Sequence, residues 1–185
     1  MRGVVAALSL ALIAALCLLM VVTLRSTIFP PTTKFETIEI RGSTRFYSQV
    51  TKALLLLRTK SPRAFATVTN NIGRIEEAKK SGMAAYETPP TFELADPSAF
   101  YSVTWCAIAI AHDSLHSKMY HDYLREHPGQ RVPDLIWTGE QAEKQCCDYE
   151  LGVAIEIGAP PYEIQWAKWD PKNRYWEVPE SKADW

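Results

Sequence analysis

Residues 107–123, AIAIAHDSLHSKMYHDY, form the stretch around which the rest of the chain is organised. His112 and His116 stand four residues apart in it, with Asp113 between them. Four-residue spacing places two side chains on one face of an α-helix, one turn apart. Two imidazoles in that position can bind one divalent metal ion at about 2.0–2.1 Å each. The stretch therefore predicts a helix that presents a pair of metal ligands.

The helix that carries this pair is expected to span about 97–125. Asp96 and Pro97 suit its start, because Asp can cap a helix and Pro is favoured in the first turn. The first half of the segment is nearly all apolar, which is typical of a helix buried on most sides. Just before it, Thr91–Leu94 (TFEL) predicts a short strand, which Pro90 would place near a sheet edge.

A zinc site of this kind needs a third protein ligand, and a catalytic site leaves the fourth position to water. The next segment begins with Thr138 and Gln141, three residues apart, which fits a capping box at the start of a second helix. That helix is expected to continue to about Ile157 and to carry Glu140 and Glu143 in its first turns. If it packs antiparallel to the histidine helix, one of these carboxylates faces the metal.

Glu143 is the preferred third ligand. Cys146 and Cys147 follow it by three and four positions and supply the small side chains that close packing of a ligand helix requires. Glu140 lies nearer the exposed end of the helix, where it can serve the cap and the helix dipole instead.

Two other side chains of the histidine helix are candidates for supporting roles. Tyr120 lies four residues after His116 and can reach the site as a hydrogen-bond donor, although core packing is the commoner fate of such a residue. His121 lies off the face that the pair shares, so we expect it at the surface or behind the ligands.

A histidine-acidic-x-x-histidine motif on an apolar helix, followed by a glutamate on the next helix, resembles the zincin metallopeptidases of the glutamate-ligand type. The likeness covers 91–150, with the strand TFEL, the helix with HDSLH and the helix with EQAEKQCC. The resemblance implies a helix-rich α+β domain that binds Zn²⁺ through His112, His116 and Glu143. It also implies hydrolysis of a peptide or protein substrate.

The resemblance puts Asp113 at the place of the catalytic base, where the family has Glu. Asp is one methylene shorter, with about 1.5 Å less reach, and a general base must come within about 2.6–3.2 Å of its proton or act through a water. Zinc binding is unaffected by this difference. Proteolysis by Asp113 would require a second water.

A carboxylate-bridged dinuclear metal protein is one alternative. Asp113 and His116 have the acidic-x-x-His spacing of ferritin-like bundles, and Glu140 and Glu143 would add ligands. That design takes such a motif from each of two helices, and the chain has one. The alternative therefore ranks below the zincin.

A non-enzymatic interaction or structural domain, anchored to a membrane, is the other alternative. The histidine helix would then be ordinary core. A partner surface would come from the tryptophans, an enriched residue type at interfaces, namely Trp137, Trp166, Trp169, Trp176 and Trp185.

The N-terminal segment predicts a membrane anchor. Val4–Leu24 contains no charged residue and would span about 30 Å as a helix, the thickness of a bilayer core. A signal peptide has a shorter apolar region, of about 7–15 residues, that ends in a small-x-small site. We therefore expect an uncleaved transmembrane anchor over 1–25 and a linker over 26–34 stiffened by Pro30 and Pro31. The soluble domain is expected outside the cytoplasm.

The remaining residues, 35–185, are expected to form one α+β zincin-like domain. Alternating residues in Phe35–Ile40 predict a half-buried strand. Helical spacing predicts a helix over 44–57 and another that starts at Ser61-Pro62 and continues through Ile72 towards Ile75. The aromatic-rich 162–169 and 174–178 predict a closing β-hairpin.

The composition and net charge narrow the class of protein further. The chain has 185 residues, 47% of them hydrophobic, and a net charge of −1. This near-neutral balance gives no basic footprint, which argues against a nucleic-acid partner. Outside the anchor, Cys106, Cys146 and Cys147 are an odd number and form no evident disulfide framework. A Cys106–Cys146 bridge is possible, but small buried thiols are the commoner outcome.

Overall fold

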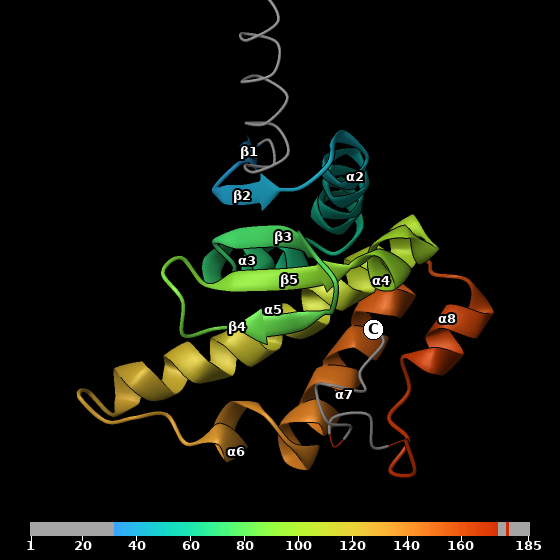
Figure 1. Ribbon diagram of the computed structural model, residues 1–185. Coiled ribbons are helices and arrows are strands. Elements are labelled where there is room, and N and C mark those ends of the chain that lie inside the picture. The colour runs from blue at the N-terminus through green and yellow to red at the C-terminus, as the bar shows by residue number, and fades with distance from the viewer. Residues whose placement is uncertain (1–31, 174–176, 178–185) are drawn as a thin grey trace, which may run out of the picture. The chain divides into compact units, whose positions relative to one another are not determined.

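A computed structural model of the protein describes residues 32–173 and residue 177 (Figure 1). The predicted membrane helix over 4–24 lies outside these residues. Among the helices that the structure describes, none combines the length and the apolar character needed to cross a bilayer. The first strand begins at Thr32, so the sheet starts inside the 26–34 stretch that was expected to be a linker.

The strands form one mixed sheet with the order β1-β2-β3-β5-β4. β2, β3 and β5 are parallel to one another, and β1 and β4 pair antiparallel at the two edges. The strands are β1 (Thr32–Phe35), β2 (Ile38–Arg41), β3 (Arg74–Ala78), β4 (Gly82–Ala84) and β5 (Thr91–Ala95). The protein is therefore α+β, as predicted, with a larger sheet than the sequence indicated.

Two strand predictions are corrected. The single strand expected over 35–40 is a hairpin of β1 and β2, because Glu36 takes a positive φ of 52° and reverses the chain. The TFEL strand exists as β5, but it lies between β3 and β4 and not at an edge. Pro90 precedes β5 and its carbonyl oxygen accepts from Gly73 and Arg74, so its missing N–H costs the ladder no hydrogen bond.

The helices agree with the sequence pattern more closely than the strands do. Those predicted over 44–57 and after Thr138 are both present, and the histidine pair is helical. The helices are α2 (Thr44–Lys60), α3 (Pro62–Asn71), α4 (Asp96–Tyr101), α5 (Val103–Glu126), α6 (Asp134–Trp137), α7 (Glu140–Glu156) and α8 (Pro161–Trp166).

The extension of the second helix to Ile75 is wrong. Ile72 is already extended, and Ile75 lies in β3. Gly73 separates them at a point of close approach, since a Cβ there would lie 2.4 Å from the Cβ of Pro89. The helical spacing of Ile75 is therefore coincidental.

The long helix expected over 97–125 is two helices. Ser102 is extended, with φ −156° and ψ 171°, and its Oγ accepts the Trp105 N–H at 2.8 Å. This side-chain cap satisfies one of the free N–H groups of α5. The capping box at the next helix is wrong, because Gly139 occupies the N-cap and the Thr138 hydroxyl donates to the Asp134 carbonyl of α6.

The C-terminal β-hairpin is also wrong where the structure describes it, because its expected first arm is α8. Glu163 of α8 is fully buried, and its carboxylate accepts from the hydroxyls of Ser102 at 2.7 Å and Thr104 at 2.5 Å. A buried carboxylate needs such donors. The contact fixes a helical turn beside the N-terminus of α5. The expected second arm lies almost entirely outside the described residues.

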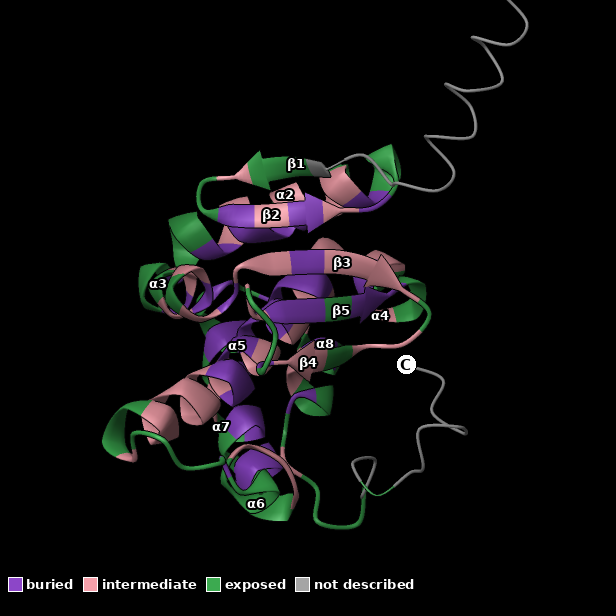
Figure 2. Ribbon diagram, turned by 60° about the vertical axis from the view of Figure 1, so that its left-hand side comes forward, coloured by how far each residue is buried: buried purple, intermediate pink, exposed green. Residues whose placement is uncertain are grey.

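The core lies on one face of the sheet (Figure 2). Ile38 and Ile40 of β2 are buried with Ile75 of β3 and Phe92 of β5, and they pack in one cluster with apolar residues of α2, α3 and α5. On the opposite face of β2 and β3, Glu39 accepts from the side chain of a neighbouring arginine. α5 contacts β5 on one side and α7 on another, so the histidine helix is the central support of the domain.

Candidate metal centre

The candidate site lies between α5 and α7. Residues 143, 146, 147 and 150 of α7 have the spacing i, i+3, i+4, i+7, which places them on one helix face. That face packs against the face of α5 that carries the two histidines. The α7 residues are all buried: Glu143, Cys146, Cys147 and Glu150.

The ring nitrogens of the pair and the Glu143 carboxylate converge. His112 Nε2 and His116 Nε2 are 3.0 Å apart. Glu143 Oε2 lies 3.3 Å from His112 Nε2, and Glu143 Oε1 lies 3.6 Å from His116 Nε2. Tetrahedral ligands bonded at about 2.0–2.1 Å would be about 3.3 Å from one another. These distances are close to those between ligand atoms around one zinc ion, with a different Glu143 oxygen nearest each ring.

The other nitrogen of each ring has a partner of its own. His112 Nδ1 lies 2.6 Å from Glu150 Oε2, and His116 Nδ1 lies 2.6 Å from the carbonyl oxygen of Trp137. A carbonyl can only accept, so His116 carries its proton on Nδ1. With Nδ1 of His112 donating to the carboxylate, the two Nε2 atoms face each other, and their separation of 3.0 Å is that of a hydrogen bond when one ring carries a second proton. Metal-bound histidines show this arrangement, with the outer N–H given to a carboxylate or a carbonyl.

The charges of the cluster shift its pKa values strongly. Burial alone lowers the pKa of His112, but attraction to Glu150 and hydrogen bonds with Glu143 and Glu150 outweigh it and hold the pKa well above its usual value. Burial likewise lowers the pKa of His116, and side-chain hydrogen bonds to Cys146 and Glu143 raise it to about 10. Burial raises the pKa of Glu143, whereas both histidines lower it, and the net direction is down. The carboxylates around the two histidine rings therefore stabilise a positive charge at the rings.

Asp113 lies next to the pair and faces a cavity. Burial and, less strongly, repulsion by Glu143 and Glu150 raise the pKa of Asp113 to about 6, against the lowering effect of the two histidines. A carboxyl group with a pKa near neutrality is suited to taking up and releasing a proton. Asp113 lines the cavity together with His112.

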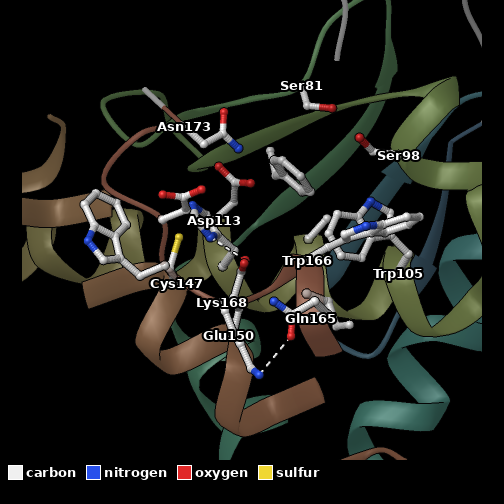
Figure 3. A pocket seen from close by; sticks show the side chains of 16 residues that line it. Ser81, Ser98, Trp105, Asp113, Cys147, Glu150, Gln165, Trp166, Lys168 and Asn173 are labelled. Carbon is white, nitrogen blue, oxygen red and sulfur yellow. Dashed lines mark hydrogen bonds and ion pairs between the residues drawn. The ribbon is translucent and has the colours of Figure 1, made fainter. Parts of the chain in front are cut away.

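The cavity has a volume of about 850 Å³, within the usual range of ligand pockets. Figure 3 shows Asp113, Cys147 and Glu150 together at one part of it and Trp105 and Trp166 at another. His112 lines it as well. An acidic wall beside the histidine pair thus faces an aromatic wall across a space large enough for a small molecule or a peptide side chain.

The three other residues that the sequence suggested for the site, Glu140, Tyr120 and His121, lie outside the cluster of His112, His116 and Glu143 or at its border. Glu140 is exposed in the first turn of α7. The Tyr120 ring packs edge-on against His121 and Trp137, with centroids 5.3 and 5.2 Å away. Tyr120 thus contacts the ring of Trp137, and the backbone carbonyl of Trp137 accepts the hydrogen bond from His116 Nδ1. His121 points elsewhere, towards Ala85 and a second, smaller pocket.

The three cysteines of the described chain are free thiols, so the possible Cys106–Cys146 bridge is not formed. Cys106 is inert packing, since burial raises the pKa of its thiol to about 12. Cys146 Sγ, however, lies within 4.8 Å of ring nitrogens of His112 and His116, and Cys147 groups in the same way with His112 and Glu150. The interpretation of this pair as packing residues alone was incomplete.

Sequence reasoning also missed Glu150 and the Trp137 carbonyl. Glu150 was detectable, because it follows Glu143 by seven residues and so lies two turns along the same face. The Trp137 contact depends on the backbone path between α6 and α7, for which the sequence holds no comparable signal.

Comparison of the chain with protein-family models, curated proteins and solved structures gives no match in any of the three. The zincin resemblance therefore stays a prediction.

We expect the metal-free protein to lose stability as the pH rises from 7 to 9. The pKa of His116 is about 10 in the folded state and near its ordinary value of about 6.5 when unfolded. The folded state then binds more protons between these values, so its stability is greatest below the lower one and falls towards the higher. Urea unfolding in the presence of a chelator measures this slope. A His116→Gln variant serves as the control and should show a smaller slope. An equal slope in both proteins would contradict the account.

Proposed function

We propose that the protein binds one zinc ion through His112 Nε2, His116 Nε2 and the Glu143 carboxylate. The observation that carries the proposal is the approach of the two Nε2 atoms to 3.0 Å while each Nδ1 is held by an acceptor. The 3.0 Å contact requires a proton or a cation between the two nitrogens, and in the metal-free protein a proton fills this place because the pKa of both rings is raised. The adjacent carboxylate and the near-tetrahedral spacing favour a divalent cation.

The finer proposal is a zincin-like hydrolase that cleaves a peptide or protein substrate. A bound zinc ion would supply Lewis acidity and lower the pKa of a water ligand towards neutrality. Asp113 would take the proton of that water, directly or through a second water. Because His112 lines the cavity, an ion bound to it would lie close to the cavity. Glu150 would fix the orientation of the His112 ring. The support is that His112, Asp113 and Glu150 line one cavity and that the Glu143 carboxylate lies beside both histidines.

The experiment is elemental analysis of the purified full chain after dialysis against zinc. We expect about one zinc ion per chain in the wild type and less than about a tenth of that in the His112→Ala/His116→Ala variant, because two of three ligands are gone. His127→Ala is the matched control. Its ring stacks on Tyr123 at 4.1 Å at the C-terminal end of α5, where His127 is the residue that caps the helix. Equal zinc in the double variant, or none in the wild type, would overturn the proposal.

A non-enzymatic interaction domain is the second candidate. The observation in its favour is a group of aromatic rings around α4 and α8, of which Tyr101, Tyr162 and Trp166 are 51%, 49% and 53% exposed. Exposed aromatic groups of this kind are enriched at protein interfaces. The elemental analysis separates the candidates, because an interaction domain with an ordinary histidine core retains no zinc.

A further inference from the structure

Cys146 lies on the same face of α7 as Glu143, one turn further along. Its side chain is fully buried, and its Sγ lies within 4.8 Å of ring nitrogens of both His112 and His116. A cysteine that only fills space needs no such neighbours. Here a thiol, two imidazoles and a carboxylate from two packed helices are gathered at one point.

We propose that the Cys146 thiolate is a fourth protein ligand of the zinc ion, so that the resting centre is His112, His116, Glu143 and Cys146. The inference rests on the proposed zinc site and goes beyond it. A site made from the histidine pair and one glutamate leaves a position to water, whereas this set completes a tetrahedron with protein atoms.

The distances allow this coordination. Zn–S bonds of about 2.3 Å and Zn–N bonds of about 2.0–2.1 Å put a sulfur about 3.6 Å from each nitrogen ligand. The observed limit of 4.8 Å therefore requires a closure of at most about 1.2 Å. Rotation about the Cα–Cβ bond moves the sulfur and is the motion that would supply this closure. On binding zinc, the thiol releases its proton to solvent, and its sulfur bonds to the ion in place of a water molecule, which also returns to solvent.

His112 and Cys146 would approach the zinc ion from different sides. His112 lines the cavity, together with Asp113 and Glu150, whereas Cys146 is not among the cavity-lining residues of the described chain. The thiolate thus approaches from within the α5–α7 interface. A substrate or water would enter from the cavity side, as a fifth ligand or by displacing the thiolate. A thiolate ligand also favours zinc over the hard ions magnesium and calcium.

Cobalt(II) substitution of the full chain tests the proposal, because a cobalt–thiolate bond gives an intense near-ultraviolet charge-transfer band that nitrogen and oxygen ligands lack. We expect the band in the wild type and in Cys147→Ser, its matched control at the adjacent position. In Cys146→Ser we expect bound cobalt, visible from its weak d–d bands, without the near-ultraviolet band. A band that survives in Cys146→Ser, or that is lost in Cys147→Ser instead, would overturn the assignment.

Zinc-edge X-ray absorption of the wild type gives the same answer if Cys146→Ser does not fold. One sulfur at about 2.3 Å supports the inference, and a shell of nitrogen and oxygen alone at about 2.0–2.1 Å contradicts it. Metal bound without a sulfur ligand would leave the three-ligand site intact. A wild type that binds no zinc or cobalt at all would overturn both proposals.

Discussion

Removal of zinc is expected to lower the thermal unfolding midpoint of the protein by about 8–16 °C. At free zinc about 1,000 times its dissociation constant, binding to the folded state alone adds about 4.1 kcal/mol. In a domain of about 150 residues, each kcal/mol corresponds to about 2–4 °C. Calorimetry of the full chain with zinc, with a chelator and with zinc restored measures the shift.

The double variant His112→Ala/His116→Ala provides the control for this experiment. Its midpoint should be the same with zinc and with chelator, because the ligand atoms are missing. His127→Ala should keep the full shift. A wild-type midpoint that stays within about one degree on chelation, a change of less than about 0.5 kcal/mol, would show that the histidine pair is ordinary core.

The second large effect concerns hydrolysis. If Asp113 is the general base, Asp113→Asn should lower the rate of peptide cleavage by about 10²–10⁴-fold. The variant should keep its zinc, since the proposed ligands are unchanged. The reason is that Asp113 lines the cavity together with His112 and has a pKa of about 6. Steady-state kinetics on a peptide that the zinc-loaded wild type cleaves, with zinc content measured in parallel, tests this.

Asp113→Glu completes the comparison. It restores the carboxylate with about 1.5 Å more reach, so it should recover activity well above that of Asp113→Asn and bring the base closer to a zinc-bound water. Activity of Asp113→Asn within about two-fold of the wild type would remove Asp113 from the mechanism.

The sequence alone predicts those parts of the candidate site whose geometry depends only on the helical period. The spacing of His112 and His116 determines their shared face in any helix, and the placement of Glu143 needed only an antiparallel neighbour. Glu150 obeys the same period and was overlooked. The directions of the ring nitrogens were inaccessible, because they depend on Glu150 and on a backbone carbonyl of another element.

The errors in the fold come from contacts between residues far apart in the chain. The segment from Tyr162 to Trp169 is rich in aromatic residues and resembles a strand. It contributes a helix because Glu163 is buried against hydroxyls at the start of α5. Ile75 fits the helical period of the preceding segment, yet it pairs with Ile40 and Phe92 across the sheet. Such pairings override local propensity.

The most direct test of the central claim is an anomalous difference map from crystals of the zinc-loaded full chain, measured above and below the zinc edge. The account predicts one peak between α5 and α7, about 2.0–2.2 Å from His112 Nε2, His116 Nε2 and a Glu143 oxygen. A map with no peak there, while the two Nε2 atoms remain in contact, would contradict it.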